Sequence, residues 1–287
     1  MDLEPEGIVS PDTDIVIGND PAVREIELLL EQGKIDEAIV AIDMAIESGQ
    51  GIESDLLYLR GDACLGLGRA REAECQFREV LRGDPDCPAS RCWLAMSLYL
   101  QWRFDEAEVA VKAARALSDA LVDADVVAGC LLERLGDYVE ADGLFERAAT
   151  ASPDKYSLPV RLSQSDFDAE VLKASGLLPD RFHDYLASLS VVVQAVPDSA
   201  FAARTRAADG EERSPDMLGL FDGKPLVEGE ATVDQPLRAT IYLFQRNLER
   251  IATGREDLSE QIRITLWREL GRYLGFDEGD MVQFGLG

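Results

Sequence analysis

The chain has 287 residues, of which 46% are hydrophobic and 7% aromatic, enough apolar material for about two globular domains. Its 55 acidic and 28 basic residues give a net charge of −27, which makes nucleic acid and anionic membrane surfaces poor partners because phosphate groups are repelled. The five cysteines form no C-x-x-C pair, and no uncharged apolar run approaches 18 residues. We therefore expect reduced thiols in a cytoplasmic protein without membrane insertion.

The N-terminal segment is strongly acidic. Its first twenty residues hold six acids, no base, and two prolines at Pro5 and Pro11. High net charge of one sign together with prolines is typical of disordered segments. We predict a disordered acidic leader over residues 1–19.

A repeat of about 34 residues follows, over residues 20–153. Its clearest markers are four alanines that recur every 34 or 35 residues: Ala38, Ala73, Ala107 and Ala141. Five residues before each alanine stands a glycine or, once, a tryptophan: Gly33, Gly68, Trp102 and Gly136. Four residues after each alanine comes a bulkier apolar side chain, which we expect to fill the gap between neighbouring units: Ile42, Phe77, Val111 and Phe145. A small residue lets two helices approach closely, and a glycine suits the turn between them, so the pattern predicts four helix–turn–helix units.

This period and pattern resemble the tetratricopeptide repeat. The resemblance implies that the four units stack into a helical solenoid with a concave groove, because one unit cannot bury its apolar face alone. It also implies that the first helix of each unit lines the groove. Trp102 departs from the glycine position, which leaves the shape of the third turn open.

The sixteen positions that the repeat frame points into this groove include no lysine or arginine. The predicted partner-binding residues are acids and apolar side chains: Asp55, Tyr58, Asp62, Met96, Tyr99, Asp123 and Glu133. An acidic rim with apolar side chains between suits a basic or amphipathic segment of a protein partner. The alternative interpretation is that these acids form a simple solvated face.

Residues 154–164 read as a linker, and residues 165–287 as a second domain of mixed α and β structure. Its expected helices are 166–176, 179–186, 247–252 and a long one at 258–274; its expected strands are 190–196, 217–221 and 239–244. Asp222-Gly223 predicts a hairpin turn that returns through 224–226. Residues 202–216 are polar and charged, which predicts a loop.

The long C-terminal helix carries the segment Arg268-Glu269-x-x-Arg272-x-x-Gly275-x-x-Glu278. The spacing is that of His-Glu-x-x-His, which places two zinc ligands one helical turn apart and a glutamate between them to activate water. With neighbouring phrases such as Leu218-Gly-Leu-Phe-Asp-Gly-Lys-Pro-Leu226, this half resembles the minimal zincin-like metallopeptidases. The resemblance places the family's two zinc histidines at Arg268 and Arg272, its general base at Glu269 and its third ligand at Glu278.

Arginine has only N–H donors, so neither Arg268 nor Arg272 offers zinc a lone pair. We expect no metal and no cofactor at this position, and we expect the arginines to pair with Glu269, Asp277 or Glu278. The sequence thus predicts a non-catalytic interaction adaptor with a degenerate metallopeptidase domain. Two alternatives stay open: a residual hydrolase with Glu269 as base and a non-zinc metal on Asp277, Glu278 and Asp280, or a chaperone or antitoxin-like binder of a basic effector.

Overall fold

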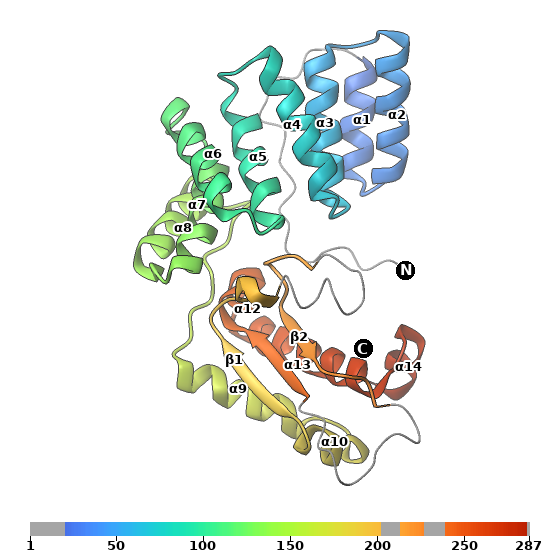
Figure 1. Cartoon of the computed structure of the whole chain (residues 1–287), viewed down its shortest axis with the longest axis vertical. Helices are drawn as coiled ribbons and strands as arrows, with labels where there is room; N and C mark the ends of the chain where they lie inside the picture. The colour runs from blue at the N-terminus through green and yellow to red at the C-terminus, as the bar shows by residue number, and fades with distance from the viewer. Residues whose placement is uncertain (1–20, 202–212, 227–238, 286–287) are drawn as a thin grey trace. The chain divides into compact units, whose positions relative to one another are not determined.

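The computed structural model of the chain describes residues 21–201, 213–226 and 239–285 (Figure 1). It divides into two compact units, Met1–Ser157 and Leu158–Gly287. The predicted leader at 1–19 and most of the predicted loop at 202–216 lie outside the described residues. No helix in the described ranges is both long enough and apolar enough to cross a membrane.

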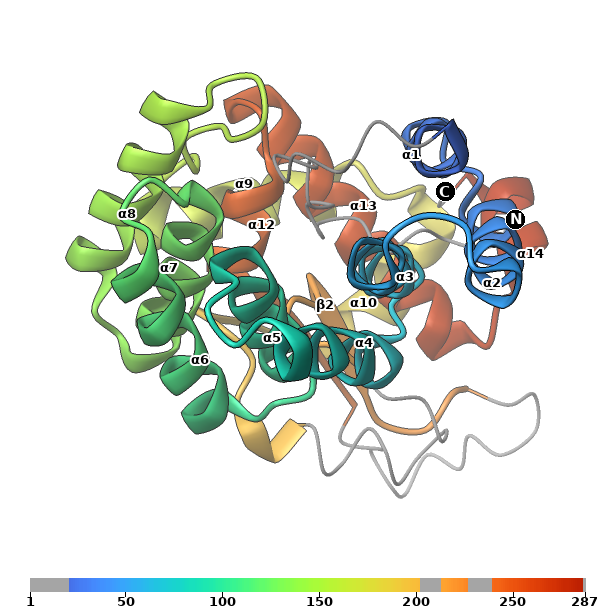
Figure 2. The same ribbon diagram turned by 90° about the horizontal axis from the view of Figure 1, so that it is seen from above.

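The first unit, as far as it is described, consists of helix pairs joined by short turns. The pairs are α1 (Pro21–Glu31) with α2 (Ile35–Ser48), α3 (Glu53–Gly66) with α4 (Ala70–Gly83), α5 (Pro88–Leu100) with α6 (Phe104–Leu117), and α7 (Val122–Leu135) with α8 (Tyr138–Ala151). The pairs form an arc in which α1, α3, α5 and α7 lie on the inner side (Figure 2). Along this inner side α1 contacts α3, α3 contacts α5, and α5 contacts α7. The four predicted repeat units are therefore present as a helical solenoid.

The turn inside each pair places one residue in the left-handed backbone region. That residue is Gly33 with φ 69°, Gly68 with φ 69° and Gly136 with φ 84°, and in the third pair it is Trp102 with φ 63°. A side chain makes this region unfavourable, so glycine is the expected residue. The third turn thus keeps the shape of the others although it lacks the glycine.

Glycines on the inner helices make room for phenylalanines on the outer ones. A Cβ atom added at Gly61 would lie 2.7 Å from the ring of Phe77, and one added at Gly129 would lie 2.7 Å from the ring of Phe145. Both rings pack against the first helix of their own unit. The sequence predicts that the apolar side chain at this repeat position fills the gap between neighbouring units. In the structure, however, the contacts of Phe77 and Phe145 with these glycines lie within one unit.

The second unit contains a three-stranded sheet and helices. Its described elements are α9 (Gln164–Gly176), the 3-10 helix η1 (Asp180–Phe182), α10 (His183–Ala187), β1 (Ser190–Gln194), β2 (Gly219–Asp222), β3 (Thr240–Phe244), α12 (Gln245–Ile251), α13 (Arg255–Leu274) and α14 (Glu278–Phe284). The strand order is β1-β3-β2, with β1 parallel and β2 antiparallel to the central β3. All three predicted strands are present, and the unit is of the predicted α+β class.

Helix α13 forms the centre of this unit's core. Leu258, Ile262, Leu266 and Leu270 recur every four residues, so they share one face of the helix, and all four are fully buried. The helix contacts β2, β3 and α9, and the indole N–H of Trp267 donates a 3.1 Å hydrogen bond to the carbonyl of Ala174 in α9. This packing fixes the face of α13 that carries the altered motif.

Two features of this unit differ from the expectation. The predicted hairpin return through 224–226 is wrong, because this segment forms no strand and the amide of Leu226 instead donates to the carbonyl of Tyr273 at the end of α13. Helix α14 was not predicted. It begins with a capping box between Asp277 and Asp280, and its Met281 side chain packs against Gly271 of α13, where a Cβ atom would have no room.

Candidate functional site

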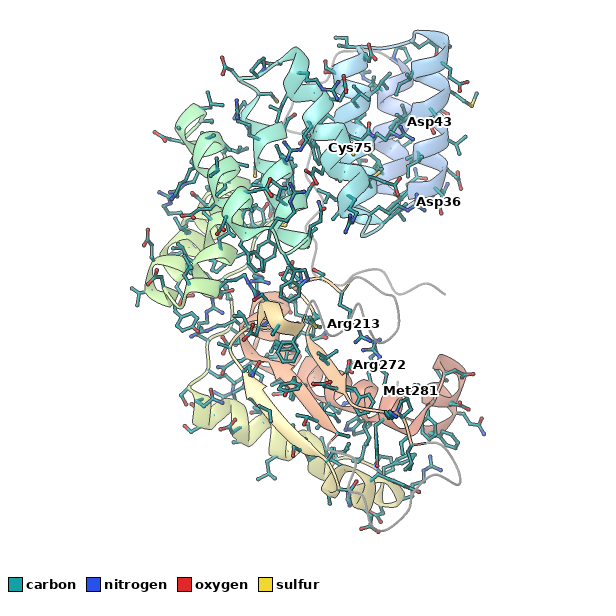
Figure 3. All side chains as sticks on the ribbon, viewed as in Figure 1. Asp36, Asp43, Cys75, Arg213, Arg272 and Met281 are labelled. Atoms are coloured by element: carbon teal, nitrogen blue, oxygen red, sulfur yellow. The ribbon has the colours of Figure 1, made fainter. Side chains whose placement is uncertain are left out.

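The altered zinc motif spans buried and exposed positions of α13, and Glu269 is its buried member and faces strand β2. Glu269, at the position of the family's general base, is 4% exposed. One carboxylate oxygen accepts a 2.7 Å hydrogen bond from the backbone N–H of Phe221 in β2. The other accepts a 2.7 Å hydrogen bond from Nη1 of Arg272, whose place in the second unit is labelled in Figure 3. The expected pairing of Arg272 with Glu269 is therefore confirmed.

The remaining motif positions are arranged differently. Arg268 is partly exposed, and within the described ranges it has no ion-pair partner. Glu278 is the first residue of α14, but its side chain lies outside the described residues. Asp277 and Asp280 exchange hydrogen bonds of 2.8 and 3.2 Å in the capping box. Of the three carboxylates in the alternative metal site, Asp277 and Asp280 therefore serve in the cap of α14.

The residues at this site do not fit the zinc ion that the family resemblance implies. Zinc needs imidazole, thiolate or carboxylate ligands, and a guanidinium offers none of these. His183, the chain's single histidine, lies exposed at the start of α10. Across the described ranges, no three His, Cys, Asp or Glu side chains lie close enough together to hold a metal ion.

The seven predicted partner-binding residues lie on the inner helices, but most are buried. Tyr58, Asp62, Met96, Tyr99, Asp123 and Glu133 are each between 1% and 7% exposed, and Asp55 is half-buried. The structure thus brings acids and aromatic rings together on the inner side of the arc. It does not present them as an open, solvated row, and their role in binding a partner stays a prediction.

Asp123, on the inner helix α7, pairs with two side chains of the segment that follows α8. Its Oδ1 lies 3.0 Å from the Nζ of Lys155 and accepts a hydrogen bond from the hydroxyl of Tyr156. Burial, followed by the nearby charges of Asp62 and Asp123, raises the pKa of Tyr58 well above its usual value. Burial and the charge of Asp123 likewise raise the pKa of the Cys92 thiol, so this thiol stays protonated and unreactive.

Asp125, two residues further along α7, is held by arginines of the array. Its Oδ1 lies 3.2 Å from the Nε of Arg115 and accepts a hydrogen bond from Arg147. A cavity of about 530 Å³ beside it is lined by both signs of charge. Within this cavity Asp125 is therefore already paired with two cations of the array.

Glu249 of α12 was missed by the sequence analysis. It is fully buried, and its carboxylate accepts hydrogen bonds from the amide of Leu162, the side chain of Gln245 and the guanidinium groups of Arg161 and Arg246. These contacts attach part of the predicted linker at 154–164 to the second unit. The spacing of Gln245 and Arg246 from Glu249 on one helix is visible in the sequence, but the burial of the group is not.

Comparison with protein families agrees with both resemblances. The model of the tetratricopeptide repeat family matches residues 23–77 and 58–121, and that of the zincin-like metallopeptidase family matches residues 186–286. The fourth helix pair, α7 and α8, lies beyond the matched repeats but has the same helix–turn–helix form. Comparison with the curated proteins found no match.

Several solved structures are similar to part of the chain. They include MamA, with 18% identity, covering 45% of this chain and 74% of that one at a TM-score of 0.38. YrrB, described as a tetratricopeptide-repeat protein with an unusual peptide-binding site, has 19% identity, covering 46% and 68% at a TM-score of 0.38. A thermophilic tetratricopeptide-repeat protein of Thermus thermophilus, TTC0263, has 18% identity, covering 46% and 73% at a TM-score of 0.41.

The family matches and the architecture identify the two parts of the chain. Repeats of the tetratricopeptide family indicate a scaffold for protein–protein interaction. The chain therefore contains tetratricopeptide repeats, matched over residues 23–121, followed by a zincin-like metallopeptidase domain matched over residues 186–286.

Proposed function

We propose that this protein is a non-catalytic interaction scaffold. Its repeat array holds a basic or amphipathic segment of a protein partner, and its zincin-like domain, which lacks zinc ligands, adds a second binding surface. The observation that carries the proposal is the state of Glu269. Both of its carboxylate oxygens are already bonded, one to the N–H of Phe221 and the other to Arg272.

A general base in this position would need a free oxygen beside a metal-bound water. Here Arg272 supplies positive charge on the same helix, three residues from Glu269. The contact with Phe221 further ties Glu269 to strand β2. These contacts support a structural role for the glutamate, which holds α13 to the edge of the sheet.

Metal binding and peptide hydrolysis test the loss of catalysis. We expect purified wild-type protein to bind no zinc in the micromolar range by calorimetry and to hydrolyse neither casein nor peptides. The double variant Arg268→His/Arg272→His restores two imidazoles at the ligand spacing, and we expect it to gain measurable zinc affinity. Micromolar zinc binding by the wild type, or turnover that a chelator abolishes, would contradict the proposal.

The charge of the array supports a basic partner. Residues 1–153 hold 32 acids and 13 bases, a net charge of −19, whereas residues 154–287 have a net charge of −8. Opposite charges steer association and help to select the partner. Capture from native lysate, followed by mass spectrometry, is expected to yield a protein with a basic segment. The variant Asp55→Asn removes one half-buried acid of the inner helices, and we expect it to weaken this capture.

A further inference from the structure

The segment that follows α8 places a lysine and a tyrosine on the inner side of the array. Helix α8 ends at Ala151, and the amides of Lys155 and Tyr156 both donate to the carbonyl of Ser152, at 3.1 and 2.9 Å. Within the described ranges, the backbone of residues 152–156 bonds only to itself and to the end of α8. Side chains, not backbone pairing, therefore attach this segment to the inner helices.

Lys155 contacts a buried carboxylate and an aromatic ring, as a bound ammonium ligand would. Its Nζ lies 3.0 Å from Asp123 and 6.0 Å from the centroid of the Trp93 ring, and its side chain is only 12% exposed. Tyr156 is 7% exposed and donates its hydroxyl to the same carboxylate oxygen. A buried carboxylate and an aromatic face are the two groups that recognise an ammonium ion most strongly.

The two acids at the start of α7 are neutralised in different ways. Asp125 is paired with Arg115 and Arg147, which belong to helices α6 and α8. Asp123 is paired with Lys155, which lies outside the helices. A buried carboxylate left without a partner is strongly unfavourable, so Asp123 needs a cation to pair with.

We propose that Asp123 and Trp93 form a lysine-binding subsite on the inner face, and that the segment carrying Lys155 and Tyr156 is its intramolecular occupant. A partner segment that presents a lysine followed by an aromatic side chain competes with this occupant. The inference rests on the proposed function, which it deepens by naming the side chains that the array recognises.

The tether makes the occupant a strong competitor. A segment joined directly to α8 has an effective concentration in the millimolar range for a short flexible connection. An external ligand binds only the fraction of molecules in which the subsite is open, so its apparent affinity falls by that fraction. A partner segment therefore displaces the occupant only if it makes more contacts with the array than Lys155 and Tyr156 make.

A peptide from the chain's own sequence tests the subsite directly. The probe is a fluorescently labelled peptide of residues 152–158, SPDKYSL, and the protein is the full chain with Lys155→Ser and Tyr156→Ser. We expect this variant to bind the peptide at least about tenfold more tightly than the wild type does, because its subsite is empty. Adding Asp123→Asn, or replacing the lysine of the peptide with serine, is expected to remove that gain.

Two further variants guard against misfolding and unspecific charge effects. Lys155→Met with Tyr156→Phe keeps the apolar bulk of the segment and removes both donors to Asp123, and it should also bind the peptide more tightly than the wild type. Lys112→Met removes an exposed lysine that pairs with Glu108 on the outer side, and it should leave peptide binding unchanged. Circular dichroism confirms that each variant is folded.

The proposal is overturned if folded variants with an emptied subsite do not bind the peptide up to millimolar concentration, or bind it no better than the wild type. Because the probe is the chain's own segment, this result is independent of capturing a partner. Loss of the scaffold function would instead show as catalysis, or as zinc binding, in the experiments on Arg268 and Arg272.

Discussion

At the scale of single residues, Trp102 combines an unfavourable backbone conformation with favourable packing of its side chain. Its backbone has φ 63°, which a side chain disfavours, while its ring packs 5.9 Å from the ring of Phe104. The guanidinium of Arg134 lies 5.2 Å from the centroid of the Trp102 ring. The packing of the indole therefore offsets the strain of the turn, which glycine relieves in the other three units.

Replacing Trp102 with alanine and with glycine separates these two contributions. Both variants lose the aromatic contacts, so both should be less stable than the wild type. Only alanine keeps the unfavourable left-handed conformation, so we expect Trp102→Ala to unfold at lower urea concentration than Trp102→Gly, by about 0.5–1 kcal/mol in free energy of unfolding. Equal stability would show that the turn is not strained.

The motif on α13 shows what single residues can and cannot predict. The pairing of Arg272 with Glu269 followed from their spacing of three on a helix and from their opposite charges. The second bond of Glu269, to the amide of Phe221, depends on the register of β2 against β3 and on the packing of α13 over β2. No pattern in the sequence contains that information.

At the scale of helices, the repeat units match the volume of facing side chains. Units two and four combine Gly61 with Phe77 and Gly129 with Phe145. At the same two positions unit three has alanine and valine, and unit one has isoleucine and isoleucine: Ala95 with Val111, and Ile26 with Ile42. In units two and four the phenylalanine on the outer helix therefore coincides with the absence of a side chain on the inner helix, as close packing requires.

Filling one of these glycine positions is expected to destabilise the array. In Gly61→Ala the new methyl group meets the ring of Phe77, and we expect a loss of about 1–3 kcal/mol in the free energy of unfolding by urea. Adding Phe77→Leu should recover part of that loss.

The matched control is Gly143→Ala, at an exposed position of α8 where nothing lies within 4 Å of the new atom. Removing a helical glycine there should raise stability by up to about 1 kcal/mol. If Gly61→Ala behaved like this control, the packing argument would be wrong.

The elements that the sequence predicted well are those with a long, repeated or strongly periodic signal. The eight repeat helices share a period of about 34 residues, and α13 has a buried residue every fourth position. Helix α14 has only seven residues, too few for a periodic signal, and its capping box is visible only when the helix start is known. The occupation of Asp123 could not be predicted because Lys155 lies in an irregular segment whose path no periodicity describes.

At the scale of the whole chain, acidic charge opposes the compact state of the repeat array. The net charge of −19 over residues 1–153 produces repulsion that salt screens. Ion pairs such as Arg103 with Glu74, at 2.6 Å, and Arg78 with Glu74, at 2.8 Å, are weakened by the same screening. These pairs are partly exposed and contribute little each, so we expect the repulsion to dominate.

Thermal unfolding at different salt concentrations decides between the two effects. Raising sodium chloride from about 10 to about 150 mM is expected to increase the unfolding temperature of the array by about 2–5 °C, since repulsion is relieved. Circular dichroism in the far ultraviolet follows the helices. A decrease in unfolding temperature would show that the ion pairs contribute more than the repulsion.

The contact between Met281 and Gly271 makes the C-terminal helix sensitive to oxidation. The thioether of Met281 occupies the space left by the missing side chain of Gly271 on α13. Peroxide converts a thioether into a polar sulfoxide, whose added oxygen would have to fit against bare helix backbone. Oxidation of Met281 is therefore expected to detach α14 from α13. Enzymatic reduction of the sulfoxide would restore the packing of α14.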